Sequence, residues 1–99
     1  MTAAEPRIEV TDNAAGSRYE IRVDGMLAGF SEYHDFRQQR TFIHTEIEPE
    51  YEGRGLGGRL AAAALDDVRT KGRQVVASCP FIAAYIRDHE QYADLLVSR

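Results

Sequence analysis

Apolar and polar positions alternate along the first half of the chain with a period of two residues. In residues 19–23 apolar side chains are separated by charged ones, a pattern typical of a half-buried strand. An Asp-Gly pair at residues 24–25 is a strong hairpin signal, so residues 26–33 are expected to form the returning strand. Residues 41–47 alternate again, and residues 8–10 favour a shorter strand. This half therefore predicts an antiparallel meander.

The last of these strands has two predicted faces. Strict alternation places Thr45 and Ile47 on one face and Phe42 and His44 on the other. The polar residues 34–39 come before it, and they predict a loop between the two long strands.

Helical periodicity replaces this alternation after Pro49. Apolar residues recur at helical spacing between Leu56 and Val68, and they include a run of alanines that favours helix. Gly72 has the position of a helix C-terminus. Residues 75–77 then predict a short apolar strand.

The second half also sets the expected topology. A strand that is reached through a helix is normally parallel to the strand before that helix, so residues 75–77 should pair in parallel with residues 41–47. Pro80 suits the first position of a second helix, whose inner face would carry Phe81 and Tyr85. The predicted fold class is α/β, with a mixed, mainly antiparallel sheet, a parallel strand pair at a glycine-rich loop and two main helices.

Composition favours one folded domain over residues 1–99, with residues 1–7 frayed. Its hydrophobic fraction is 43%, and its net charge of −4, with scattered basic residues, argues against a general nucleic-acid binder. No apolar segment approaches the ~20 residues that a membrane span needs, and residues 1–7 lack the apolar core of a signal peptide. The single cysteine, Cys79, cannot form an internal disulfide, so a cytoplasmic location is predicted.

The glycine-rich loop at residues 53–58 is the most informative chemical feature. It lies between a predicted strand and a predicted helix, where backbone N–H groups and the helix dipole suit a phosphate or pyrophosphate. A tight turn without a ligand explains the glycines about as well. A P-loop is excluded because Arg59-Leu60 follows the last glycine, and a dinucleotide-binding fold is excluded because the loop follows an antiparallel meander.

At this loop the sequence resembles the GNAT superfamily of acyl-coenzyme A-dependent N-acyltransferases. Residues 52–57 align with the superfamily's pyrophosphate loop, Arg/Gln-x-x-Gly-x-Gly/Ala, except that the first residue here is a glutamate. The likeness narrows to the short single-domain (YjdJ-type) subfamily through three ordered stretches, at residues 44–47, at residues 49–57 and at residues 79–81 with Tyr85. The resemblance implies a minimal GNAT-like fold.

The resemblance also implies an activity, the transfer of an acetyl group from acetyl-coenzyme A to a primary amine. It implies catalytic roles for His44, as general base, and for Cys79 and Tyr85 at the sulfur end of the cofactor. The residues that it implies for cofactor binding are those of the loop, Gly53, Arg54, Gly55, Leu56, Gly57 and Gly58.

Each proposed catalytic residue also has a structural alternative. A neutral imidazole can take a proton from an amine, but His44 could equally be a partly buried residue bonded to the backbone. Cys79 precedes the helix that begins at Pro80, whose N-terminus stabilises a thiolate, but free cysteines usually pack in the core. Tyr85 could protonate a leaving thiolate or simply pack.

A second functional hypothesis belongs to another class. The protein could bind acyl-coenzyme A without turnover, as a sensor or an accessory protein. For an enzyme, we expect a small-molecule or protein amine as the acceptor, and the glutamates at residues 46–52 would favour a cationic one. We expect a monomer or a weak dimer, with no metal, nucleic-acid or membrane partner.

Overall fold

Antiparallel hairpins build most of the sheet, as the alternation predicts. The structure, a computed structural model, describes residues 5–97 of the chain. Its five strands are β1 Ile8–Asn13, β2 Arg18–Val23, β3 Met26–Phe36, β4 Gln39–Ile47 and β5 Gln74–Ala77. The strands lie in the sheet in chain order, with β1 to β4 antiparallel and β5 parallel to β4. The predicted mixed sheet with one parallel pair is confirmed.

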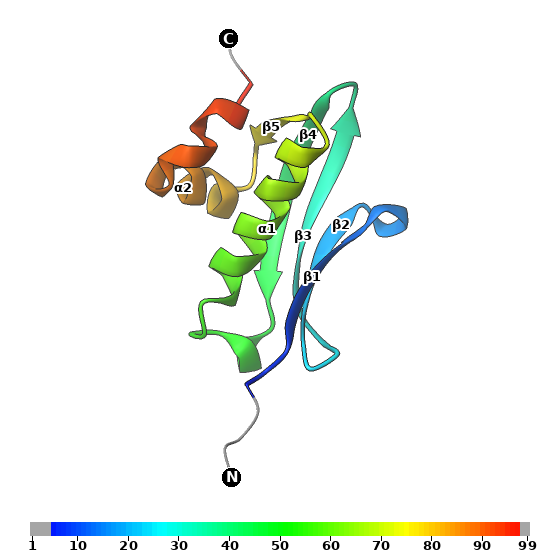
Figure 1. Ribbon diagram of the computed structural model, residues 1–99, viewed down its shortest axis with the longest axis vertical. Coiled ribbons are helices and arrows are strands. Elements are labelled where there is room, and N and C mark those ends of the chain that lie inside the picture. Colours follow the sequence, from blue (N-terminus) through cyan, green and yellow to red (C-terminus); the bar gives the residue numbers. More distant parts are fainter. Residues whose placement is uncertain (1–4, 98–99) are drawn as a thin grey trace.

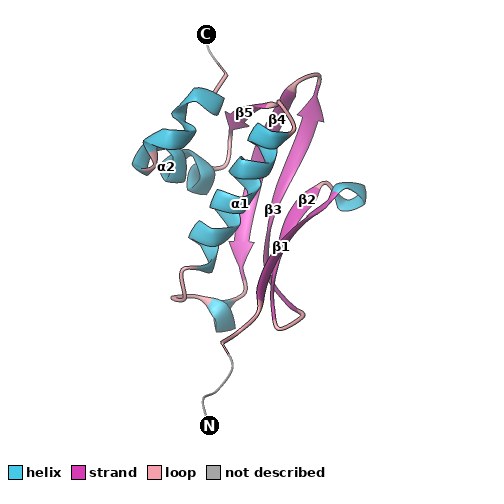
Figure 2. Cartoon of the chain, viewed as in Figure 1, coloured by secondary structure: helices cyan, strands magenta, loops and turns pink. Residues whose placement is uncertain are grey.

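The helical elements are the 3-10 turns η1 Ala14–Gly16, η2 Pro49–Tyr51 and η3 Glu90–Leu95, and the α-helices α1 Leu56–Thr70 and α2 Pro80–Asp88. The two α-helices and η3 lie together beside the sheet, whereas η1 lies at the β1–β2 turn and η2 follows β4. Helix α1 packs across the sheet, and α2 packs beside it over β4 and β5 (Figures 1 and 2). Among the helices of residues 5–97, none combines the length and the apolar character needed to cross a membrane.

The core forms between α1 and one face of the sheet. Tyr19, Ile21 and Phe42 enter it from the strands and are fully buried. Leu60, Ala64 and Val68 of α1 meet them, because residues four apart on a helix share a face. The helical periodicity of the second half of the sequence therefore marks the buried side of α1.

The Asp-Gly pair forms the tight turn that the sequence predicts. Asp24 and Gly25 have φ values of 50° and 83°, the positive values that a two-residue hairpin turn requires. Arg7 bonds to this turn, since its backbone N–H donates to Asp24 Oδ1 over 2.9 Å and its carbonyl accepts from the Asp24 N–H over 2.8 Å. The predicted fraying therefore does not extend to Arg7, and residues 1–4 of that prediction lie outside the described residues.

The predicted loop at residues 34–39 is wrong. Strand β3 continues to Phe36 and β4 begins at Gln39, which leaves a turn of only two residues. Asp35 faces Arg40 in the strand register, and their side chains form a two-point ion pair. Cross-strand charge pairing thus supports a strand where the polar composition indicated a loop.

A β-bulge corrects the predicted faces of β4. Tyr33 pairs with Phe42 and Glu32 pairs with His44, so Ile43 is an extra residue between the two pairs. Such an insertion reverses the facing of the side chains that follow it. Phe42 is therefore buried in the core while His44 is exposed on the opposite face, and the prediction that they share a face is wrong.

Candidate active site

The glycine-rich loop joins η2 to the start of α1 at one end of the sheet. Gly53 and Gly55 have φ values of 79° and 74°, which non-glycine residues rarely adopt. Gly55 is the N-cap of α1, and no side chain caps the helix there. The N–H groups of the first helical turn have no intrahelical acceptor, so they are available to an anion outside the helix.

Gly57 and Gly58 have a different role from the first two glycines. Both lie inside the first turn of α1 with ordinary helical φ values. A Cβ atom on Gly57 would lie 2.9 Å from Cζ of Phe81, and one on Gly58 would lie 3.7 Å from Cε1 of Tyr85. These glycines therefore let α2 approach α1 closely.

A pocket of about 320 Å³ opens at this loop. Backbone of the loop lines one side of it, and apolar side chains from β4, from η2 and from α2 line the other. Arg54 lies near this pocket, with its guanidinium 5.3 Å from the centre of the Tyr51 ring. Glu52, the residue that departs from the superfamily pattern, is exposed, so its charge does not have to be neutralised inside the protein.

Strands β4 and β5 separate next to this pocket. Their parallel pairing ends at Phe42 and Ala77, and the last contact along the same line is a 2.9 Å hydrogen bond from the Cys79 N–H to the Phe42 carbonyl. Beyond this hydrogen bond, β4 continues through Thr45 toward the glycine loop, whereas the segment that follows β5 turns into α2. The bulge at Ile43 lies at this point of separation.

Cys79 lies at the junction between β5 and α2. It is the N-cap of α2, with Pro80 at the first helical position as predicted. Its side chain is only 2% exposed, and its thiol donates a 3.4 Å hydrogen bond to the Thr45 hydroxyl. Thr45 is in turn 2.8 Å from the hydroxyl of the fully buried Ser31. The thiol is thus held against β4, one residue from His44.

His44 lies on the exposed face of β4, away from the helices. Its Nε2 atom is 3.1 Å from Oε1 of Glu46, and its ring lies 6.0 Å from that of Phe30. Adjacent strand residues point to opposite faces, so His44 and Thr45 emerge on different sides of β4. Within residues 5–97, no hydrogen bond joins His44 to Cys79.

Tyr85 lies on α2, partly buried against α1. Its ring stacks on His89 at 3.8 Å between centres, and Gly58 borders its edge. Burial, together with the negative charge of Asp66, raises the pKa of the Tyr85 hydroxyl. A hydroxyl that stays protonated suits a proton donor, although the structure places it toward α1 rather than in contact with Cys79.

A family model now matches most of this chain. The model describes the GCN5-related N-acetyltransferases and aligns with residues 18–95, which include the glycine loop and the point where β4 and β5 separate. The chain belongs to the GCN5-related N-acetyltransferase family. The glycine loop, the strand separation and α2 therefore correspond to parts of a known fold.

A curated relative supports this membership. The L-amino acid N-acyltransferase MnaT of Escherichia coli (strain K12) is 28% identical over 60 residues, which cover 56% of this chain and 35% of MnaT. The chain thus spans about a third of the length of this curated relative.

Solved structures agree with the family fold. A candidate GCN5-like N-acetyltransferase from Staphylococcus aureus has a TM-score of 0.69 at 19% identity, over 92% of this chain and 89% of that one. A candidate acetyltransferase from Salmonella typhimurium was solved with its cofactor acetyl-CoA. Its TM-score is 0.54 at 26% identity, and the match covers 75% of this chain and 47% of that one.

Two residues of the cleft were not singled out as site residues from the sequence. Thr45, which bonds to Cys79, was assigned only to a face of its strand, and the bulge that aims it cannot be recognised from alternation. Phe81 was expected on the inner face of its helix, but it is 41% exposed and borders the loop pocket. Its place directly after Cys79-Pro80 was the available signal.

Proposed function

We propose that this protein transfers an acetyl group from acetyl-coenzyme A to a primary amine. The observation that carries the proposal is the open glycine loop at the start of α1, beside the point where β4 and β5 separate. An anion site beside two strands that separate suits a ligand with a pyrophosphate and a long arm.

The comparisons support acyl transfer in general. The chain belongs to a family named for N-acetyl transfer, and its relative MnaT is an N-acyltransferase. The Salmonella structure holds acetyl-CoA, which supports the same donor here. The choice of donor and of acceptor is part of our proposal.

The proposed reaction assigns a task to each part of the cleft. Backbone N–H groups of residues 53–58 bind the pyrophosphate, and the arm of the donor lies along β4 toward the bulge. The amine nitrogen attacks the thioester carbon while His44 takes its proton, and the carbon–sulfur bond then breaks. Tyr85 or Cys79 supplies a proton to the departing thiolate. Turnover requires both groups to approach the thioester when the donor is bound.

The binding-only hypothesis has one specific observation in its favour. The His44 side chain lies on the exposed face of the sheet. The Cys79 thiol lies on the other face, where it is buried against Thr45. A sensor of acyl-coenzyme A would need the glycine loop but neither of these groups. Measured turnover separates the two hypotheses.

The first experiment measures thermal stability with coenzyme A, acetyl-coenzyme A and adenosine. A ligand at a hundred times its Kd that binds only the folded state adds about 2.7 kcal/mol. We expect both coenzymes to raise the melting temperature and adenosine, which lacks the pyrophosphate, to have little effect. An unmoved melting temperature at millimolar coenzyme A would contradict the proposal.

A second experiment identifies the acceptor. Release of free coenzyme A is followed with a panel of amines that includes polyamines, lysine peptides and amino acids. We expect cationic amines to react fastest, because Glu46 lies beside His44 on the exposed face of β4. Binding of the donor without turnover of any amine would favour the sensor.

A further inference from the structure

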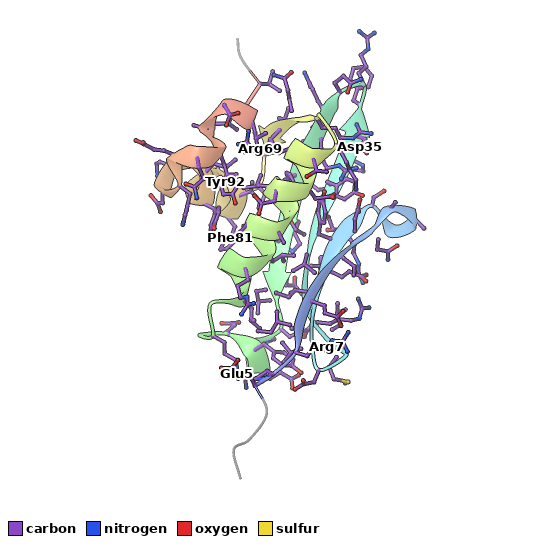
Figure 3. The ribbon with its side chains drawn as sticks, viewed as in Figure 1. Glu5, Arg7, Asp35, Arg69, Phe81 and Tyr92 are labelled. Carbon is purple, nitrogen blue, oxygen red and sulfur yellow. The ribbon has the colours of Figure 1, made fainter. Side chains whose placement is uncertain are left out.

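The exposure of Phe81 is unexpected for an aromatic side chain on a packed helix. This side chain is 41% exposed, although it is on α2 beside the buried Ile82. Its ring packs over the first turn of α1, since a Cβ atom on Gly57 would come within 2.9 Å of Cζ. Figure 3 shows Phe81 between α2 and α1. Gly57 therefore makes room for the Phe81 ring. Because this ring is partly exposed, packing of the core does not explain its position.

The ring forms one wall of the loop pocket. Phe81, Ile47 and Leu56 bring apolar side chains from α2, from β4 and from α1 to the same 320 Å³ space. The opposite wall is the backbone of the glycine loop, where the helix N–H groups lie. The pocket thus joins an anion site to an apolar surface, and Glu52, which is exposed, is the charged residue among those that line it.

This combination matches one part of the ligand that we propose. In coenzyme A, a single CH2 group links the pyrophosphate ester oxygen to a carbon atom that carries two methyl groups, and the amide-linked arm begins beyond this branched carbon. A ligand that places its pyrophosphate on the α1 N-terminus must place this branched carbon beside the loop. Apolar surface is favoured there because methyl groups gain free energy on leaving water.

We propose that Phe81, with Ile47 and Leu56, binds the dimethyl-bearing carbon of the pantetheine arm and so selects coenzyme A over simple nucleotides. The inference rests on the proposed function, because it names a further binding residue for the same donor. Phe81 acts in binding, and it is given no part in the chemical step.

The test compares two ligands on two variants by calorimetry. Coenzyme A carries the pyrophosphate and the arm, whereas ADP carries a pyrophosphate without the arm. We expect Phe81→Ala to weaken coenzyme A binding about tenfold, the scale of partial burial of an aromatic ring. ADP affinity should stay within about twofold. The control is Phe36→Ala, since Phe36 is also exposed but lies at the β3–β4 turn.

A third variant tests the position of the ring without removing it. Gly57→Ala adds the methyl group that would collide with Cζ, so the ring must swing away from α1 or into the pocket. We expect coenzyme A binding to fall in Gly57→Ala, and to fall no further when Gly57→Ala is added to Phe81→Ala. Melting curves without ligand confirm that each variant folds.

The outcomes distinguish the two proposals. If the wild type binds coenzyme A and Phe81→Ala binds it with the same affinity, the role of the ring is overturned and the proposed function stands. An equal loss of coenzyme A and ADP affinity also overturns it, because the ring would then act through the anion site. Absence of coenzyme A binding in the wild type overturns both.

Discussion

The two ends of α1 are held in opposite ways. At its C-terminal end, Lys71 Nζ lies 2.7 Å from carboxylate oxygens of both Asp12 and Asp67, which ties the helix to β1. At its N-terminal end, the glycine loop leaves backbone groups open. Among the salt bridges of the described residues, none involves residues 52–58. One end is closed by paired side chains and the other is free to meet a ligand.

Arg40 is the centre of the closed end. It is 4% exposed, and it bonds to both Asp35 carboxylate oxygens, at 2.7 and 2.8 Å, and to the Tyr19 hydroxyl at 2.7 Å. Its guanidinium also lies 3.8 Å from the centre of the Tyr33 ring. The Arg40 hydrogen bonds hold the pKa of Asp35 below its ordinary value. Asp35 marks this end of the sheet in Figure 3.

The comparison teaches that stability and the proposed binding reside at separate places. A buried charge is tolerated only when its partners are complete, so the closed end has little freedom to change. The open end leaves the backbone N–H groups of the first turn of α1 without side-chain partners, and a ligand can use them. Variants at the open end should therefore alter function, and variants at the closed end should alter stability.

The largest expected effect lies at the functional end. His44→Ala should lower turnover by roughly 10²–10⁴-fold through loss of the general base. Coenzyme A binding should remain, because His44 is not part of the glycine loop. Steady-state kinetics and calorimetry on the same preparation measure both. His34→Ala is the matched control, since His34 is an exposed strand histidine on β3. Equal activity of the two variants would remove His44 from the mechanism.

The next effect lies at the closed end. Arg40→Met should lower the free energy of unfolding by about 3–5 kcal/mol, because it leaves the partners of a buried charge unpaired. Urea unfolding followed by circular dichroism measures it. Arg87→Met, which removes an exposed arginine of α2, should leave the unfolding free energy nearly unchanged. A small change in Arg40→Met would show that the closed end does not stabilise the fold.

Acid should weaken the sheet through a third set of charges, around the buried Glu20 of β2. Hydrogen bonds from Arg22, Asn13 and Arg18 lower the pKa of Glu20 from 4.5 to about 2. A lowered folded-state pKa stabilises the protein above the unfolded value, and this contribution is lost as the pH falls from about 4.5 to 2. We expect Glu20 to account for a loss of roughly 2–3 kcal/mol.

The pH dependence of urea unfolding measures this loss. Glu20→Gln should be less stable than the wild type at pH 6 and should show a shallower decline in acid. A decline that is equally steep in both proteins would assign acid sensitivity to other carboxylates. Asp12 and Asp35 are the first candidates, because their pKa values are also lowered.

The smallest expected effect on stability concerns Cys79. Cys79→Ala should cost on the order of 1 kcal/mol, since it removes a small buried side chain and its bond to Thr45. It should also lower turnover, by no more than His44→Ala does, while coenzyme A still binds. Full activity in this variant would leave Cys79 as a packing residue.

Intact-mass analysis sharpens the interpretation of Cys79. The wild type is incubated with acetyl-coenzyme A and no amine. We expect direct transfer, and therefore no added acetyl group. A gain of one acetyl group that hydroxylamine removes would instead show an acyl-cysteine intermediate.

Local features of this protein could be predicted from its sequence because they depend on residues that are neighbours in the chain. The Asp-Gly turn, the helix that follows the glycine loop and the start of α2 at Pro80 all follow from backbone preferences of one or a few residues. The loop residues of the candidate site were predicted for the same reason. Parallel pairing of β5 followed from the helix that precedes it.

Tertiary structure alone decided the features that depend on how strands and helices pair. The bulge at Ile43 is set by the register between β3 and β4, and it is this bulge that separates His44 from Phe42. The burial of Arg40 depends on Asp12 of β1 and Tyr19 of β2, which lie 28 and 21 residues away in the sequence, as well as on the nearby Asp35. Phe81 reaches the glycine loop only because α2 packs on α1. No local pattern encodes such contacts, because their free energy arises only when separate elements meet.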